Sequence, residues 1–344
     1  ETMTDLYELK AAILAAKENC SLPVFTSMSF EARGRTFTGC TVESFGVTAR
    51  GLGANAVGIN CSLGPKEILP FAKRLCRSVP AGVPVFVKPN AGLPNPDGSY
   101  NLNAAEFAAE MQEYAATGIS MLGGCCGSEP ESIRLLKELT QDKTPAAKTP
   151  IVRSRLCTPV RCVEVNGITV VGERINPTGK KRLQQALRDG DLDYVGSQGS
   201  SQQEQGADIL DVNVGLPEID EVKVIQQATE QLQGSTLLPL QIDSTDPAAV
   251  EAAVRRYAGK PIINSVNGKQ QIMDEIFPLV AHYGTNVVGL TLDEDGIPDT
   301  AEARFAIAER IVAEAARYGI GPDRILIDCL VMTASTNQRQ AEQI

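Results

Sequence analysis

Short apolar runs rich in β-branched residues alternate along the chain with longer stretches whose apolar positions recur every three or four residues. In the first part of the chain this pattern predicts the strands Val24–Ser29, Ala56–Asn60, Val83–Lys88 and Ile119–Gly123. It also predicts the helices Tyr7–Glu18, Val42–Gly51, Glu67–Val79, Ala104–Thr117 and Glu129–Leu139. Because parallel strands need a crossover, usually a helix, this order indicates a parallel sheet covered by helices.

The alternation stops at residues 140–162, where three prolines and five basic side chains accompany small residues. This composition is typical of a linker, although a long surface loop within one domain has the same features. We therefore expect a first domain over residues 1–140, a linker over 141–165 and a second domain over 166–344.

The alternation then restarts. It predicts the strands Ile168–Gly172, Asp208–Asn213, Leu237–Asp243, Pro261–Ser265, Thr285–Leu292 and Arg324–Leu330. The helices expected between them are Lys181–Arg188, Glu221–Gln233, Pro247–Tyr257, Gln270–His282 and Thr300–Tyr318. Neither part carries a GxGxxG turn or a P-loop, so dinucleotide and nucleoside triphosphate folds lack their phosphate-binding loops.

Polar residues gather instead at the carboxyl ends of the strands, as in (β/α)8 barrels. The expected fold class is therefore α/β, with two (β/α)8 TIM-type barrels in tandem. Four strands precede the linker and six follow it, against eight in a closed barrel. We thus expect both barrels to be truncated and the chain to be a piece of a larger protein.

Composition narrows the function further. The 344 residues carry a net charge of -10, which disfavours nucleic acid as a partner. No apolar run is long enough for a membrane helix and no signal peptide is apparent, so we expect no membrane partner. Nine irregularly spaced cysteines indicate a reducing cytoplasm rather than a disulfide scaffold. His282 is the only histidine, so the chemistry cannot depend on paired histidines.

Three cysteines stand at expected strand ends, namely Cys61 in GINCSLG and Cys125 and Cys126 in MLGGCCGS. The neighbouring glycines allow both adjacent thiols to turn to one side, and three thiolates with an open fourth position suit a catalytic Zn²⁺. Three buried cysteines, or a strained disulfide between Cys125 and Cys126, are the alternatives. The other six cysteines fit core or surface thiols: Cys20, Cys40, Cys76, Cys157, Cys162 and Cys329.

In the second part, five expected strands end in carboxylate or amide side chains. These residues are Glu173, Asn176, Asp211, Asn213, Asp243, Asn264 and Asp328. Each could be a helix N-cap, where Asp and Asn are favoured. Together they favour a polar pocket for a flat heterocycle such as a pterin.

The pair GINC and GGCCG, with PVFVKPNAGLP between them, resembles the zinc site of the homocysteine S-methyltransferase family. That resemblance implies that Cys61, Cys125 and Cys126 bind Zn²⁺ and that homocysteine fills the open position as a thiolate.

The motifs GERIN, DVN, IDS and INS resemble the pterin-binding barrels of methyltetrahydrofolate methyltransferases and, more distantly, dihydropteroate synthases. This resemblance implies that Asp243, Asn264 and Asp328 hold the pterin. It also places Gly179, Lys180 and Lys181 near the folate, where the two lysines would suit its glutamate tail.

The order of the two modules resembles the cobalamin-dependent methionine synthase family. The resemblance implies methyl transfer from 5-methyltetrahydrofolate through cobalamin to zinc-bound homocysteine. Cobalamin would be bound by another module, because His282 does not match the family's cobalt-ligand motif. A cobalamin-independent homocysteine methyltransferase and a non-catalytic fragment that binds zinc or folate are the alternatives. Residues 196–205 (GSQGSSQQEQ) depart from the charged helix expected there.

Overall fold

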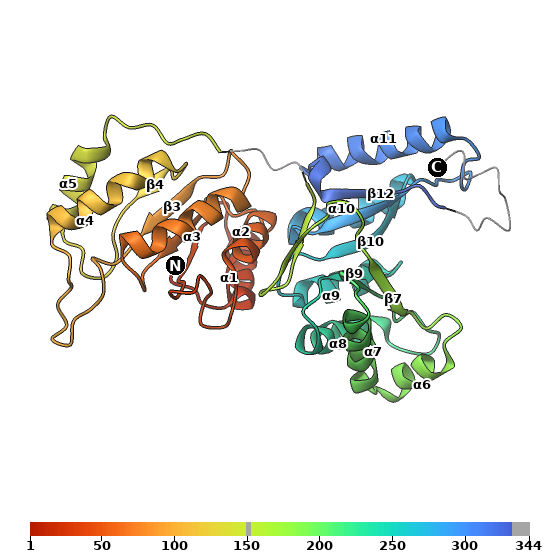
Figure 1. Cartoon of the computed structure of the whole chain (residues 1–344). Coiled ribbons are helices and arrows are strands. Elements are labelled where there is room, and N and C mark those ends of the chain that lie inside the picture. Colours follow the sequence, from red (N-terminus) through yellow and green to blue (C-terminus); the bar gives the residue numbers. More distant parts are fainter. Residues whose placement is uncertain (149–152, 332–344) are drawn as a thin grey trace. The chain divides into compact units, whose positions relative to one another are not determined.

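The computed structural model describes residues 1–148 and 153–331, and the chain divides into two compact units, residues 1–152 and 153–344. Both units combine a parallel sheet with helices that alternate with its strands (Figure 1). The α/β class and the tandem arrangement expected from the sequence are confirmed. In the described part of the chain, no helix is long and apolar enough to cross a membrane.

The first unit contains a four-stranded sheet in the order β1-β2-β3-β4. Its strands are β1 (Phe25–Met28), β2 (Ala56–Asn60), β3 (Val85–Lys88) and β4 (Met121–Leu122). Its helices are α1 (Leu6–Asn19), α2 (Val42–Gly51), α3 (Pro65–Ser78), α4 (Ala104–Met111), the 3-10 helix η1 (Gln112–Ala116) and α5 (Pro130–Thr140). Every residue of β2 is buried, because the sheet is covered where this central strand runs.

The second unit contains a six-stranded sheet in the order β12-β11-β10-β9-β8-β7. Its strands are β7 (Val171–Ile175), β8 (Ile209–Val212), β9 (Leu240–Asp243), β10 (Ile262–Asn267), β11 (Asn286–Leu290) and β12 (Ile325–Asp328). Its helices are α6 (Lys181–Asp189), α7 (Leu192–Glu204), α8 (Glu221–Ser235), α9 (Pro247–Arg256), α10 (Gln270–Tyr283), α11 (Ala301–Arg317) and the 3-10 helix η2 (Pro322–Arg324). Within residues 1–148 and 153–331, neither sheet pairs its first strand with its last, so the strands form open sheets of four and six rather than closed barrels.

The stretch expected to be a linker is partly structured. Residues 153–165 belong to the second unit and contain an antiparallel hairpin of β5 (Arg155–Cys157) and β6 (Cys162–Glu164). Leu156 of this hairpin is buried together with Ile209 and Ile262, which are the first residues of β8 and β10. The hairpin therefore covers the amino-terminal end of that sheet.

Two elements of the second unit differ from their expected positions. Strand β7 begins at Val171 rather than Ile168, whose side chain is 97% exposed. The register is set by Asp208, which accepts the N–H of Val170 and donates its own N–H to the Val170 carbonyl. The strand consequently contains Glu173 instead of ending before it. Helix α7 occupies most of segment 196–205, although the apolar pattern did not predict it and it is not the charged helix expected there.

Glycines explain how α7 packs. A Cβ atom at Gly199 would lie 2.6 Å from Leu232 Cδ2 of α8, so only glycine allows this approach of the two helices. Gln202 of α7 is 4% exposed, and its Oε1 accepts the backbone N–H of Arg174 in β7 at 2.8 Å. Helix α7 thus packs on α8 through glycine and bonds to β7 through a buried amide.

Candidate functional site

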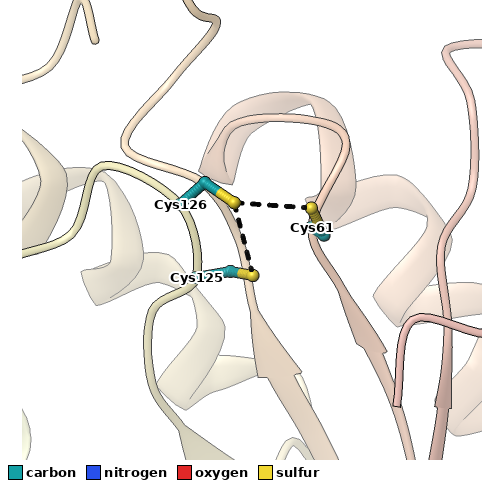
Figure 2. A group of neighbouring side chains, drawn as sticks. All are labelled: Cys61, Cys125 and Cys126. Carbon is teal, nitrogen blue, oxygen red and sulfur yellow. Dashed lines mark hydrogen bonds between the residues drawn. The ribbon is translucent and has the colours of Figure 1, made fainter. Parts of the chain in front are cut away.

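The three cysteines singled out from the sequence lie together at the carboxyl end of the first sheet. Cys61 directly follows β2, and Cys125 and Cys126 follow β4 after two glycines. The Sγ atom of Cys126 is 3.8 Å from that of Cys61 and 4.0 Å from that of Cys125, and all three lie within 4.8 Å of one another. Figure 2 shows the three sulfur atoms turned toward a common point.

The end of β3 and the loop after it fix the two cysteine segments relative to each other. The N–H of Cys61 donates to the Lys88 carbonyl at 3.0 Å. The N–H of Cys125 donates to the Pro89 carbonyl at 2.8 Å. Since both thiol-bearing segments bond to consecutive residues, the last of β3 and the first of the loop after it, the backbone fixes the spacing of the two segments.

Both backbone groups of Cys126, its N–H and its carbonyl, form hydrogen bonds. Its N–H donates to Asn90 Oδ1 at 3.2 Å, and its carbonyl accepts the N–H of Ala91 at 2.9 Å. Gly127 follows with φ +76°, and a Cβ atom there would lie 2.3 Å from the ring of Tyr100. Glycine is therefore required both for the turn and for the close approach of the tyrosine.

Cys61 itself departs from strand geometry, with φ +65°, and Ser62 continues with φ +64°. Such angles are uncommon for residues with a Cβ atom and mark a position where the surroundings fix the backbone. They turn the chain at the strand end, so that the Cys61 thiol faces Cys126 (Figure 2).

Asn60 supports the cluster from beneath. Its side chain is fully buried, and its Oδ1 accepts hydrogen bonds from Ser27 Oγ at 2.8 Å and from the Thr2 N–H at 3.0 Å. Its Nδ2 donates to Thr2 Oγ1 at 2.7 Å and approaches Cys125 Sγ at 3.9 Å. The amide thus offers an N–H to a sulfur that carries charge once deprotonated.

Burial, followed by the neighbouring Cys61, raises the pKa of the Cys125 thiol to about 11. Three thiolates this close together repel one another, so a divalent cation is the natural compensation. Tetrahedral zinc with Zn–S bonds of about 2.3 Å places its sulfur ligands about 3.8 Å apart. The observed separations of 3.8 and 4.0 Å are close to that value, and the third pair, Cys61 and Cys125, lies within 4.8 Å.

The alternatives for these cysteines do not match the structure. Cys125 and Cys126 are free thiols, with sulfur atoms far beyond bonding distance. Cys126 is exposed, while Cys61 and Cys125 are half-buried, so they are not ordinary core cysteines. Among the described residues, they form the only group of three Cys, His, Asp or Glu side chains placed to share a metal ion.

In the second unit, polar side chains gather on one face of three adjacent strands. Asp211 and Asn213 are two positions apart on β8 and its end, so they point to the same side. Asn213 Nδ2 donates to Asp243 Oδ2 at 3.0 Å, and Asn264 Nδ2 lies 3.4 Å from Asp211 Oδ1. The structure therefore brings four of the expected residues together as two hydrogen-bonded pairs on one face of the sheet, which we call the polar network.

The sequence analysis missed a fifth member, Gln241 of β9. Its Nε2 donates to Asp211 Oδ1 at 2.6 Å, and the two residues are register partners. Gln241 lies two residues before Asp243 on the same strand, so both side chains lie on the same face of the sheet. The alternation of side chains along a strand could therefore have predicted it.

The electrostatics of this network are dominated by crowded carboxylates. Asp211 is 3% exposed, and burial, followed by the charge of Asp243, raises its pKa to about 6. Burial likewise raises the pKa of Asp243, partly offset by the hydrogen bond from Asn213. A site with excess acceptors and an easily protonated acid is suited to a ring that presents several N–H groups.

The remaining expected residues lie outside this network. Glu173 is an exposed residue of β7, and its carboxylate is 3.5 Å from the ammonium group of Lys180, which also donates to the Glu173 carbonyl. Asn176 follows β7 and accepts the Thr178 N–H. Asp328 ends β12, is exposed, and accepts the Leu330 N–H at 2.7 Å. Gly179 has φ +72°, and Lys181 is exposed at the start of α6.

Helix capping does not explain the network residues. The side chains that cap helices α7, α8, α9 and α11 are Asp191, Asp220, Asp246 and Thr300. Asp211, Asn213, Asp243 and Asn264 cap none of the described helices, and their side chains bond to one another instead.

Comparisons with known proteins agree with this division of the chain. Residues 1–140 match the family model described as Homocysteine S-methyltransferase, and residues 172–344 match that described as Pterin binding enzyme. The methionine synthases of Mycobacterium tuberculosis and Mycobacterium leprae are 32% and 30% identical to the whole chain, which spans 30% of the length of each.

Solved structures similar to part of the chain include two of Xanthomonas albilineans dihydropteroate synthase. One, in complex with indole-2-carboxylic acid and 6-chloroguanine, is 25% identical with a TM-score of 0.40, covering 56% of this chain and 71% of the other. The second, in complex with 7,8-dihydropteroate, is 25% identical with a TM-score of 0.41, covering 55% and 74%. The first unit is thus similar to homocysteine S-methyltransferases, and the chain, through residues 172–344, belongs to the pterin binding enzyme family.

Proposed function

We propose that this chain is the substrate-binding part of a methyltransferase that moves a methyl group from 5-methyltetrahydrofolate, through cobalamin, to homocysteine. The products would be tetrahydrofolate and methionine. The observation that carries the proposal is the convergence of the Cys61, Cys125 and Cys126 sulfur atoms at separations that suit tetrahedral zinc. The two family matches and the methionine synthase relatives support it.

In the first unit, the three cysteines would hold Zn²⁺ and leave its fourth position to the homocysteine thiol. When bound, zinc would supply the positive charge that keeps this thiol deprotonated near neutral pH. The chain itself contributes the geometry, since the end of β3 and the loop after it fix both cysteine segments and Asn60 offers an N–H beside Cys125. No histidine is needed as a base.

In the second unit, Asp211, Asn213, Gln241, Asp243 and Asn264 would pair with the polar edge of the pterin ring. The carboxylates accept from ring N–H groups, and the amides supply both donors and acceptors. Asp328 would contact the same ligand from β12, with Glu173, Asn176, Gly179 and Lys181 at the rim. Lys180 already pairs with Glu173, so it reaches the glutamate tail of folate only by leaving that partner.

Cobalamin would be carried by another module of the intact enzyme. Two other functions are consistent with the first unit, namely a cobalamin-independent homocysteine methyltransferase and a fragment that binds without turnover. The polar network of the second unit argues against the first alternative, because direct methyl donors would not require a pterin site. Folate binding separates the proposed function from the cobalamin-independent alternative. A methyl-transfer assay with supplied cobalamin tests whether the chain is a fragment that binds without turnover.

Zinc binding tests the proposal directly, by metal analysis after dialysis against a weak chelator. Cys125→Ser should lose tight binding, because a neutral hydroxyl replaces a thiolate ligand. Cys76→Ser is the matched control, since Cys76 is buried in α3 and lies outside the cluster. About one zinc per chain in the parent and in Cys76→Ser, but not in Cys125→Ser, is expected. Full zinc retention by Cys125→Ser would refute the assigned site.

A further inference from the structure

The hairpin at the start of the second unit places two other cysteines opposite each other. Cys157 of β5 and Cys162 of β6 are register partners, and the N–H of Thr158 donates to the Arg161 carbonyl at 2.9 Å across the turn. The N–H and carbonyl of Cys157 both bond to Lys260, at 3.1 and 3.0 Å. Cys157 and Cys162 therefore form a non-hydrogen-bonded pair of the hairpin.

This kind of pair has the dimensions of a disulfide. Residues at non-hydrogen-bonded positions of antiparallel strands have Cα atoms about 4.5 Å apart, with side chains on the same face. Disulfides join cysteines whose Cα atoms are about 4.4–6.8 Å apart. Neither cysteine is part of a disulfide in the structure. Because the two are register partners, the hairpin can close the bond without moving its backbone far.

The backbone partner of Cys157 is a lysine, Lys260, in an antiparallel bridge. Lys260 is 6% exposed, and burial, followed by the nearby Arg324, lowers its pKa to about 8. Asp323, Cys157 and Cys162 act on it in the opposite direction, which places both cysteines within electrostatic reach of the ammonium group. An adjacent cation favours the thiolate form of a cysteine, which is the reactive form.

The two cysteines differ in access. Cys162 is half-buried, whereas Cys157 has no exposed surface. A reagent in solution therefore meets Cys162 first, and Cys157 is placed to act on it from the protein side.

We propose that Cys157 and Cys162 form a dithiol site whose oxidant is a small-molecule disulfide of the glutathione class. The Cys162 thiolate attacks one sulfur of the small disulfide, forming a mixed disulfide and releasing one small thiolate. The Cys157 thiolate then attacks the Cys162 sulfur, forming the Cys157–Cys162 bond and releasing the second small thiolate. The protons lost by the two cysteines are taken up by the two released thiolates, so the small disulfide is reduced to two thiols.

The product would covalently close the hairpin that covers the amino-terminal end of the second sheet. This site is independent of the zinc and folate sites, because none of its residues belongs to either. It gives a role to two cysteines that the sequence alone places among ordinary core or surface thiols.

Peptide mapping tests the proposal, because trypsin cuts between the two cysteines after Arg161. The protein is incubated with oxidised glutathione, its remaining thiols are blocked, and it is digested without reduction. We expect residues 156–161 and 162–174 to appear as one disulfide-linked pair. Cys157→Ser should stop at glutathione attached to Cys162, and Cys162→Ser should give neither product. Absence of the linked pair in the parent protein would overturn the proposal.

Lys260→Met tests the role of the cation. We expect the linked pair to form about threefold more slowly or worse, since the thiolate loses its stabilising neighbour. Lys223→Met, at an exposed lysine of α8, is the matched control and should oxidise at the parent rate. An unchanged rate in Lys260→Met would show that Lys260 plays no part in the reaction.

Discussion

Asp211 illustrates the conflict between burial and charge in the second unit. Its carboxylate is almost completely buried, and it accepts hydrogen bonds from two amides but faces the carboxylate of Asp243. Burial and this neighbour disfavour the charged form, which raises its pKa to about 6. Such a residue lowers the free energy of unfolding near neutral pH. Residues with this property are commonly found in binding sites.

Asp211→Asn should therefore stabilise the unliganded protein near neutral pH. In the parent, Asp211 binds its proton more tightly when folded than when unfolded, so stability falls as the pH rises from about 4 through about 6. Asparagine keeps an acceptor oxygen for Gln241 and Asn264 without that loss. The advantage of the variant should grow by about 2 kcal/mol between pH 4 and pH 7. Urea unfolding of both proteins across this range measures it, and a constant difference would contradict the assigned pKa.

The sequence predicts the residues with distinctive chemistry better than the residues that support them. Cys61, Cys125 and Cys126 stand out because three thiols at strand ends are rare, and the structure brings them together. Asn60 and Gln241 were not predicted, because a single amide on a strand carries no signal until its neighbours are known. Glu173 and Lys180 were expected near the folate; in the structure they pair with each other, and their part in folate binding stays a prediction.

Among the helices and strands, agreement with the sequence depends on how strongly each is patterned. Helix α2 and strand β2 lie where the periodicity places them, since both are enclosed by apolar neighbours. Strand β7 is displaced because the apolar run 168–171 suggested its start, whereas pairing with β8 decides it. Helix α7 was missed because GSQGSSQQE has few apolar positions, and its packing depends on glycines instead.

Gly199→Ala tests how α7 packs on α8. Alanine favours helices, but its Cβ atom would lie 2.6 Å from Leu232 Cδ2, so the helices must separate. We expect a loss of about 1–3 kcal/mol in the free energy of unfolding. Gly234→Ala in α8 is the matched control, since nothing lies within 4 Å of its added methyl group, and it should be neutral or stabilising. Equal effects of the two substitutions on urea unfolding would contradict this packing.

The chain as a whole carries its two candidate sites in different units. The cysteine cluster lies in residues 1–148, and the polar network lies in residues 153–331. The hairpin at the boundary was not predicted, because the prolines and basic residues of this segment resemble a linker. The pairing of β5 with β6 and the burial of Leu156 place it in the second unit.

Asp243→Asn should separate the two sites. The variant loses a charge, and one acceptor oxygen becomes a donor, so an N–H group of the pterin is left mispaired. Affinity for methyltetrahydrofolate, measured by calorimetry, should fall about ten- to a hundredfold, which corresponds to about 1–3 kcal/mol. Zinc content should stay at the parent value. Loss of zinc with unchanged folate binding would show that the two sites are assigned to the wrong units.

X-ray absorption at the zinc edge tests the central claim most directly, because it counts the sulfur atoms bound to the metal. The zinc-loaded protein should show three sulfur ligands from Cys61, Cys125 and Cys126 and one lighter ligand. Addition of homocysteine should raise the count to four and release a proton, since its thiol binds as a thiolate. A sulfur count that does not change when homocysteine is added would contradict the account.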